Sequence, residues 1–221
     1  MKKVYIEGEG RDSVYHDMWR RWGWSIAIGA ADADVIQFTG GEDVNPALYD
    51  EEPHPRTYFS RDRDEECIEL WQMAKANGIP MTGICRGGQF LNVMNGGKMF
   101  QHCDGHGIWG EHEATIIETG VKVSVTSTHH QIMRPNYETG IVLMEAPKLG
   151  TFKEHMGLSS PDPGIGWEVE NAPNEADVEA VYYPDTLSLC FQPHPEYCEE
   201  KSSCVQAYKY MLRNYLELDV G

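Results

Sequence analysis

The chain has 221 residues, of which 41% are hydrophobic and 24% are charged, as in ordinary globular proteins. Its 18 Lys and Arg against 35 Asp and Glu give a formal net charge of −17. A charge of that sign and size disfavours nucleic-acid phosphates and anionic membranes as partners. The length suits one α/β domain, so we expect residues 1–221 to form a single domain.

The cysteines and the lengths of the apolar stretches indicate the cellular compartment of the protein. The N-terminal residues lack the apolar stretch of a signal peptide, and the longest apolar runs are only strand-sized. Six cysteines occur without any Cys-x-x-Cys pair, in a chain large enough to fold without disulfides. We therefore expect a cytoplasmic protein with free thiols and no membrane partner.

The first half of the chain alternates between strand and helix patterns. Val14, Met18 and Trp22 recur at helical spacing and predict one apolar helix face. Further along, Gly78 is placed to end a helix in the left-handed conformation. In chain order, the pattern predicts strands at 3–6, 35–38 and 79–84 and helices near 14–22, 62–77 and 86–95. The buried stripe of the second helix is expected to comprise Cys67, Leu70, Trp71 and Ala74.

The second half of the chain has a different pattern. Two pairs of β-branched, alternating segments flank short turns and predict antiparallel hairpins: 112–117 with 121–126, and 180–183 with 187–191. Ser202 or Ser203 then caps a last helix, in which Val205, Tyr208, Leu212 and Tyr215 share one face. Strand–helix alternation in the first half predicts a parallel sheet with helices on both faces. The fold class is therefore α/β, with antiparallel hairpins added in the C-terminal half.

Cys85 lies where an apolar strand meets a helix without an intervening loop. Gly83 and Gly87, two residues to either side, lack the Cβ atoms that would collide in such a sharp turn. A helix N-terminus also favours the thiolate, which is the nucleophilic form of cysteine. The alternative is that Cys85 is a small buried hydrophobic residue, as most free cysteines are. The strand–Gly-x-Cys-x-Gly–helix context favours a nucleophile, and we interpret the other five cysteines as structural.

Of the nine histidines, only His194 follows a predicted strand and precedes a carboxylate by two residues. Pro195 disfavours the helical conformation for His194, and in an extended segment side chains two residues apart project to the same side. Glu196 can therefore hold one nitrogen of the imidazole while the other accepts a proton from a thiol. The alternative is an exposed proline-rich turn.

Acyl transfer also requires hydrogen-bond donors for the developing oxyanion. The backbone N–H of Arg86 begins the helix after Cys85 and is one candidate. Gly40 and Gly41 follow a second parallel strand, so they should lie at the same edge of the sheet. The N–H of Gly41 is the other candidate.

Four segments together resemble a known family: GICRGGQFLNV at 83–93, STHHQ at 127–131, FQPHPEY at 191–197 and GGEDVNPALY at 40–49. The first three look like the class I glutamine amidotransferase-like superfamily. The fourth is similar to its γ-glutamyl hydrolase branch, particularly the γ-glutamyl-γ-aminobutyrate hydrolases. The similarity covers roughly residues 35 to 200.

The resemblance implies a three-layer α/β/α, flavodoxin-like fold and hydrolysis of a γ-glutamyl amide through a γ-glutamyl thioester. It implies neither a metal nor an organic cofactor. The substrate is expected to be a small γ-glutamyl amide or glutamine. The implied site residues are a triad of Cys85, His194 and Glu196, oxyanion donors at Gly41 and Arg86, and substrate contacts at Gln89 and His130.

Two alternatives to a stand-alone hydrolase remain open. A glutaminase subunit that passes ammonia to a partner synthetase would use the same chemistry, so the triad residues cannot separate the two. A non-catalytic or metal-binding interaction domain is the other, since zinc-ligand types lie close together at His102, Cys103, Asp104, His106 and His112. Their spacing fits no common zinc pattern. The acidic stretch 168–179 is expected to be a solvated loop.

Overall fold

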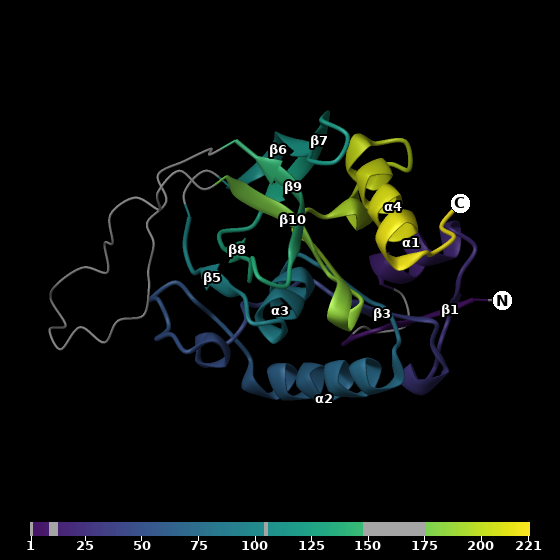
Figure 1. Ribbon diagram of the computed structural model, residues 1–221, viewed down its shortest axis with the longest axis horizontal. Helices are drawn as coiled ribbons and strands as arrows, with labels where there is room; N and C mark the ends of the chain where they lie inside the picture. The colour runs from purple at the N-terminus through teal and green to yellow at the C-terminus, as the bar shows by residue number, and fades with distance from the viewer. Residues whose placement is uncertain (1, 9–12, 104–105, 148–175) are drawn as a thin grey trace, which may run out of the picture.

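The computed structural model describes residues 2–8, 13–103, 106–147 and 176–221 (Figure 1). A nine-stranded sheet runs through it in the order β2-β1-β3-β4-β11-β10-β9-β6-β7. Its parallel half consists of β2 (Ser25–Ile26), β1 (Lys3–Ile6), β3 (Val35–Phe38), β4 (Met81–Ile84) and β11 (Ser188–Phe191). Its antiparallel half consists of β10 (Asp177–Tyr183), β9 (Ile141–Ala146), β6 (Gly107–Ile116) and β7 (Val121–Thr128).

Helices cover both faces of the parallel half. The α-helices are α1 (Val14–Arg21), α2 (Arg61–Asn77), α3 (Arg86–Met94) and α4 (Ser203–Leu216). Short 3-10 helices are η1 (Ala30–Asp32), η2 (Pro46–Tyr49), η3 (Pro184–Thr186) and η4 (Pro195–Tyr197), and a separate antiparallel pair joins β5 (Lys98–Phe100) to β8 (Ile132–Arg134). In Figure 1, α2 and α3 lie on the opposite side of the strands from α1 and α4.

Alternation along each strand builds two hydrophobic cores. In β11, Leu189 and Phe191 point to the core shared with α1 and α4, whereas Cys190 points to the core shared with α2 and α3. In β3, Val35 belongs to the first core and Ile36 to the second. Period-two alternation in strands buried on both faces is what a helix–sheet–helix sandwich requires. The predicted three-layer α/β/α fold with added antiparallel strands is confirmed.

The element predictions hold in most places. The second helix ends at Gly78 with φ +62°, and Ser202 caps α4 by accepting from the Val205 N–H at 3.2 Å. The prediction of the buried face of α1 is partly wrong, because Val14 is 39% exposed while Tyr15 and Trp19 are buried. A row of residues spaced by four drifts about 40° around the helix at each step, so its first member leaves the buried face. The strands β2, β5, β8 and β9 were not predicted.

The acidic stretch 168–179 is partly a wrong prediction. Residues 168–175 lie outside the described residues, but Asp177 and Glu179 are fully buried in β10 rather than solvated. Histidines from other segments contact both carboxylates, which explains how they are accommodated in the interior.

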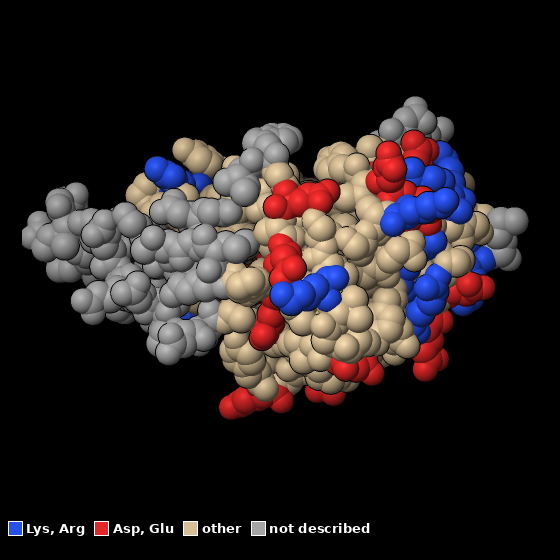
Figure 2. All heavy atoms as spheres, turned by 90° about the horizontal axis from the view of Figure 1, so that it is seen from above, with Lys and Arg blue, Asp and Glu red and all other residues tan. Residues whose placement is uncertain are grey.

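Surface charge and helix hydropathy indicate which surfaces the protein can bind. On the face seen from above, Lys and Arg side chains lie beside Asp and Glu side chains (Figure 2). Across the parts of the chain that are described, no helix combines the length and the apolarity needed to cross a bilayer. All six cysteines are free thiols.

Candidate active site

Cys85 lies at the tip of a strained strand-to-helix turn. It follows β4, precedes α3 and has φ 52° and ψ −115°, a conformation that few non-glycine residues adopt. A Cβ on Gly83 would lie 2.2 Å from the Gly87 carbonyl carbon, and a Cβ on Gly87 would lie 2.3 Å from the Phe38 carbonyl oxygen. Both glycines are therefore required by backbone contact, as expected for a nucleophile elbow.

His194 follows β11 and is oriented by two hydrogen bonds. Its Nδ1 lies 2.6 Å from Oε1 of Glu196, which is 5% exposed, and its backbone N–H donates to Thr126 Oγ1 at 2.7 Å. Holding Nδ1 against a carboxylate directs Nε2 away from Glu196. The imidazole is therefore oriented as a general base requires.

Gly40 brings the segments of Cys85 and His194 together. A Cβ on Gly40 would lie 3.1 Å from His194 Cε1, 3.2 Å from the Tyr15 hydroxyl and 3.7 Å from Cys85 Cβ. Four segments that are distant in sequence thus meet around one Cα atom. A side chain at Gly40 would press on the His194 ring and the Tyr15 hydroxyl.

The electrostatics of this cluster favour a charged imidazole. Burial alone lowers the pKa of His194, but the Cys85 thiolate, a hydrogen bond to it and the Glu196 carboxylate raise that pKa to about 10. The protonated form of the His194 imidazole is therefore favoured at neutral pH.

The backbone of Gly40 is held on both sides. The Gly40 N–H donates to the Tyr15 hydroxyl at 2.8 Å, and Arg63 Nη2 donates to the Gly40 carbonyl at 3.0 Å. In a trans peptide the carbonyl and the following N–H point in opposite directions. Because Arg63 takes the carbonyl, the Gly41 N–H is turned away from Arg63. Gly41 has φ +138°, and a Cβ there would lie 2.3 Å from Arg63 Nη1.

A buried ion pair anchors Arg63. Its guanidinium donates to Glu7 at 3.0 and 3.1 Å and to Thr39 Oγ1 at 2.9 Å. Burial raises the pKa of Glu7, but Arg63 more than offsets this effect and the net pKa is lowered. The carboxylate therefore stays charged, and the pair fixes the loop that follows β3.

The Arg86 side chain points away from Cys85. It is buried, pairs with Asp64 of α2 and donates to Cys67 Sγ at 3.0 Å. Asp64 also accepts from the Asn45 N–H at 3.2 Å, which ties the 40–49 segment to α3. Only the backbone of Arg86 is available for a role beside Cys85.

A small cavity of about 230 Å³ opens beside Cys85. Gln89 lines it, with its Nε2 donating to Gln192 Oε1 at 3.1 Å, and so does His130, whose Nε2 lies 3.2 Å from Asp43 Oδ1. The cavity is lined by Gly41, Glu42, Asp43, Tyr58, Cys85, Gln89 and residues 128–131. Four residues expected at the site line this cavity: Gly41, Cys85, Gln89 and His130. Arg86, His194 and Glu196 do not line it.

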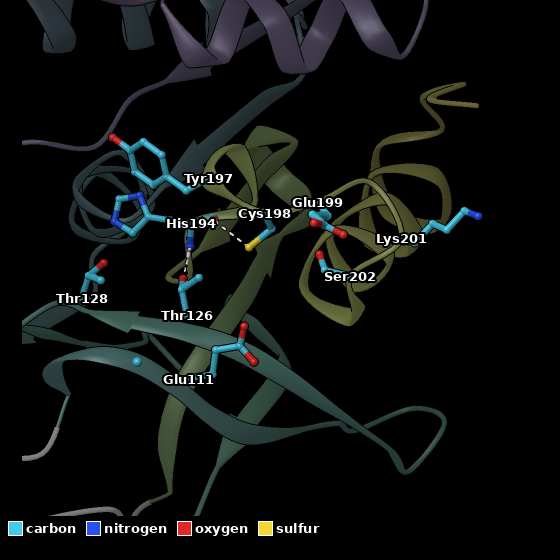
Figure 3. Close-up of a pocket in the computed structure, with 10 residues that line it drawn as sticks. Glu111, Thr126, Thr128, His194, Tyr197, Cys198, Glu199, Lys201 and Ser202 are labelled. Atoms are coloured by element: carbon cyan, nitrogen blue, oxygen red, sulfur yellow. Dashed lines mark hydrogen bonds between the residues drawn. The ribbon is translucent and has the colours of Figure 1, made fainter.

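A larger cavity of about 680 Å³ adjoins His194 (Figure 3). Its walls are formed by His194 and Tyr197 on one side and by Glu111 and Thr126 of the β6–β7 hairpin on the other. Thr128 lines both cavities. The cluster of Cys85, His194 and Glu196 is therefore bordered by one amino-acid-sized space and one roomier, partly charged space.

Three residues at the site were missed from the sequence: Glu7, Tyr15 and Arg63. A signal existed for Glu7, because it follows β1 and polar residues at the carboxyl ends of parallel strands gather at one edge. Tyr15 and Arg63 carry no such local signal, since they reach the site from α1 and α2.

The five zinc-ligand types between 102 and 112, which offered an alternative metal-binding interpretation, do not form one cluster within the described residues. Asp104 lies outside the described residues. The His102 ring stacks on His54 at 5.4 Å, whereas His106 lies 5.0 Å from the His112 ring. A different set, His106, His129 and Glu179, brings its ligand atoms within 4.8 Å of one another and could hold a metal ion.

Comparison with known proteins is consistent with this geometry. The Peptidase C26 family profile matches residues 26–196. A Mycobacterium tuberculosis protein named as a candidate glutamine amidotransferase is 49% identical over 165 residues, which cover 73% of this chain and 50% of the relative. A Lactococcus lactis protein named as glutamine amidotransferase-like is 34% identical over 172 residues, which cover 74% and 66%. The chain thus spans about half to two thirds of these relatives.

Solved structures share the fold. A glutamine amidotransferase from Thermotoga maritima superposes with a TM-score of 0.60 at 14% identity, covering 98% of this chain and 84% of that one. PurLQS from the same organism gives 0.60 at 16% identity, covering 97% and 99%. At these identities the likeness concerns architecture alone.

Proposed function

The chain belongs to the Peptidase C26 family, a glutamine amidotransferase-like family of cysteine hydrolases, and on that premise we propose that it hydrolyses γ-glutamyl amides through a thioester on Cys85. One observation carries the proposal. Cys85 and His194 both lie against the bare Gly40 Cα, and Glu196 Oε1 lies 2.6 Å from His194 Nδ1. That is the spatial order of nucleophile, base and orienting carboxylate.

The first half of the reaction forms the thioester. Cys85 Sγ, its proton transferred to His194 Nε2, attacks the γ-carbonyl carbon and gives a tetrahedral intermediate. The N–H groups of Gly41 and Arg86 donate to its oxyanion, and each such donor is typically worth about 10²- to 10³-fold in kcat. Imidazolium His194 then protonates the leaving amine, the C–N bond breaks, and the γ-glutamyl thioester remains on Cys85.

The second half regenerates the thiol. His194, now neutral, takes a proton from a water molecule as that water attacks the thioester carbonyl. The second tetrahedral intermediate uses the same oxyanion donors, and its collapse releases glutamate and the Cys85 thiolate. Glu196 holds Nδ1 throughout and stabilises each imidazolium state.

The two cavities suggest how a substrate is divided. The space of about 230 Å³ suits the γ-glutamyl group, with the Glu42 and Asp43 carboxylates available for its α-ammonium group and Gln89 and His130 beside them. The space of about 680 Å³ beside His194 suits the leaving amine, because His194 must protonate that group. An amine larger than ammonia fits this volume.

The test is release of glutamate and amine by purified protein from glutamine and from γ-glutamyl amides of a neutral, an anionic and a cationic amine. Cys85→Ala should abolish turnover, whereas Cys190→Ala, which replaces a buried thiol in the opposite core, should retain it. Turnover of a bulkier amide above that of glutamine supports the stand-alone hydrolase. Absence of Cys85-dependent turnover on every substrate would contradict it.

If the protein is instead a glutaminase that supplies ammonia to a synthetase, the same assay should give a different order of substrate preference. Glutamine would then be preferred over bulkier amides, and addition of the synthetase would raise the glutaminase rate severalfold or more. The volume beside His194 favours the hydrolase.

A further inference from the structure

A second cluster of reactive side chains lies behind the small cavity. His106 immediately precedes β6, His129 follows β7, and Glu179 lies in β10. All three side chains are buried, at 0%, 4% and 0% exposure. Their ligand atoms lie within 4.8 Å of one another, and His106 Nδ1 is 3.8 Å from Glu179 Oε1.

Each imidazole is oriented by a partner on its outer nitrogen. His106 Nε2 lies 2.7 Å from Asp177 Oδ2, and His129 Nδ1 lies 2.9 Å from the Gln131 carbonyl oxygen. Because carboxylate and carbonyl oxygens only accept, these nitrogens carry the protons and donate. The inner nitrogens, His106 Nδ1 and His129 Nε2, are then left with lone pairs.

Glu179 is oriented in the same way. Its Oε1 lies 2.9 Å from His112 Nε2, and the ion pairs that it makes within the described residues are with imidazoles. A buried carboxylate is costly unless positive charge or several donors compensate for it.

One polar atom on each of the three side chains has no hydrogen-bond partner among the described residues. His106 Nδ1, His129 Nε2 and Glu179 Oε2 are all buried and accept no hydrogen bond from any described residue. A buried polar atom without a partner is costly, and the three residues that carry these atoms bring ligand atoms within 4.8 Å of one another.

We propose that His106, His129 and Glu179 bind a Zn²⁺ ion. Two imidazole nitrogens and one carboxylate are ligands that zinc takes at about 2.0–2.2 Å, with a water molecule completing a tetrahedron. Imidazole-rich sets favour zinc over Mg²⁺ or Ca²⁺, which prefer oxygen ligands. Carboxylate and carbonyl partners on the outer nitrogens, as Asp177 and Gln131 provide, are the usual surroundings of zinc-bound histidines.

The ion would brace the substrate cavity. His129 lines that cavity together with Thr128, His130 and Gln131. Zinc at this position joins the segment between β7 and β8 to the start of β6 and to β10. The cavity wall is thereby fixed from behind.

The test measures zinc in full-length Cys85→Ala protein without a histidine tag, because the catalytic thiol could itself bind zinc. After incubation with Zn²⁺ and desalting, elemental analysis should give one zinc per chain. Co²⁺ should give the visible absorption of a tetrahedral site without a thiolate charge-transfer band, which separates this site from any cysteine site. Because the Co²⁺ spectrum is recorded on the Cys85→Ala protein, this measurement does not depend on whether the ligand variants fold.

Variants locate the ion. In the same background, His106→Gln and Glu179→Gln should each weaken zinc binding at least tenfold in chelator competition, and Asp177→Asn by about 10- to 100-fold. His102→Gln, which alters the neighbouring histidine stack, should bind zinc normally. No zinc and no tetrahedral Co²⁺ spectrum would overturn the proposal, as would zinc retained by both ligand variants.

Discussion

Gly83 lies against Gly87 so closely that a Cβ on Gly83 would be 2.2 Å from the Gly87 carbonyl carbon. The atoms nearest to such a Cβ are backbone atoms of Gly87 and Gly88, so no side chain can rotate to relieve the clash. It joins the end of β4 to the first turn of α3 and so fixes the turn that carries Cys85.

Gly83→Ala is expected to destabilise the protein by about 1–3 kcal/mol or more, because extra volume in a packed interior forces backbone shifts. Activity should fall further than stability alone explains, since the turn at Cys85 must move. The measurements are chemical denaturation and kcat/KM on the folded fraction. Gly29→Ala is the matched control, because the nearest atom to a Cβ there is 4.0 Å away. Equal effects of the two substitutions would contradict the packing argument.

Arg63→Gln is expected to lower kcat by up to about 10²-fold with a smaller change in KM. The substitution releases the Gly40 carbonyl, so the Gly41 N–H loses its fixed direction, and loss of one oxyanion donor has that magnitude. Arg61→Gln, at the exposed start of the same helix, should behave as wild type. A change in KM alone would show that Arg63 acts on substrate binding instead.

Tyr15→Phe removes the oxygen that accepts the Gly40 N–H at 2.8 Å. A buried donor left without a partner costs about 1–3 kcal/mol, and the loop can shift to recover solvent contact. We expect reduced kcat with KM nearly unchanged, measured on the best γ-glutamyl amide. Tyr5→Phe on β1 should leave both constants unchanged, and a Tyr15→Phe enzyme with wild-type kcat would remove Tyr15 from the account.

The pH dependence of kcat/KM follows from the raised pKa of His194. In the proposed mechanism imidazolium His194 protonates the leaving amine, so activity should decline as pH rises through about 10. Glu196→Gln removes a charge that raises this pKa, so the decline should move to lower pH by about 1–3 pH units. Glu138→Gln, on the surface, should leave the profile in place. A decline that does not move would show that another group limits the rate.

Local spacing made one part of the site predictable. Cys85 lies between two glycines at a strand–helix junction, and His194 and Glu196 are two residues apart, so a short window of sequence contains each relationship. Strand–helix alternation likewise predicted the three-layer fold, because buried parallel strands and amphipathic helices have distinct periods.

Other parts depended on tertiary packing. Arg63 reaches Gly40 from α2, and nothing in its own segment indicates that contact. The burial of Asp177 and Glu179 depends on His106 and His112, which lie 71 and 67 positions earlier in the chain, so the acidic segment resembled a solvated loop. Partners that are remote in sequence decide whether a charged residue can be buried.

The most direct test of the central claim is peptide mapping by mass spectrometry after rapid acid quench of the enzyme during turnover of a γ-glutamyl amide. We expect one γ-glutamyl group on the peptide that contains Cys85, sensitive to hydroxylamine as a thioester is, and its absence in Cys85→Ala. Glu196→Gln should change how much adduct accumulates but not where it lies. An adduct on another residue, or active turnover with unmodified Cys85 at every quench time and in Glu196→Gln, would contradict nucleophilic catalysis by Cys85.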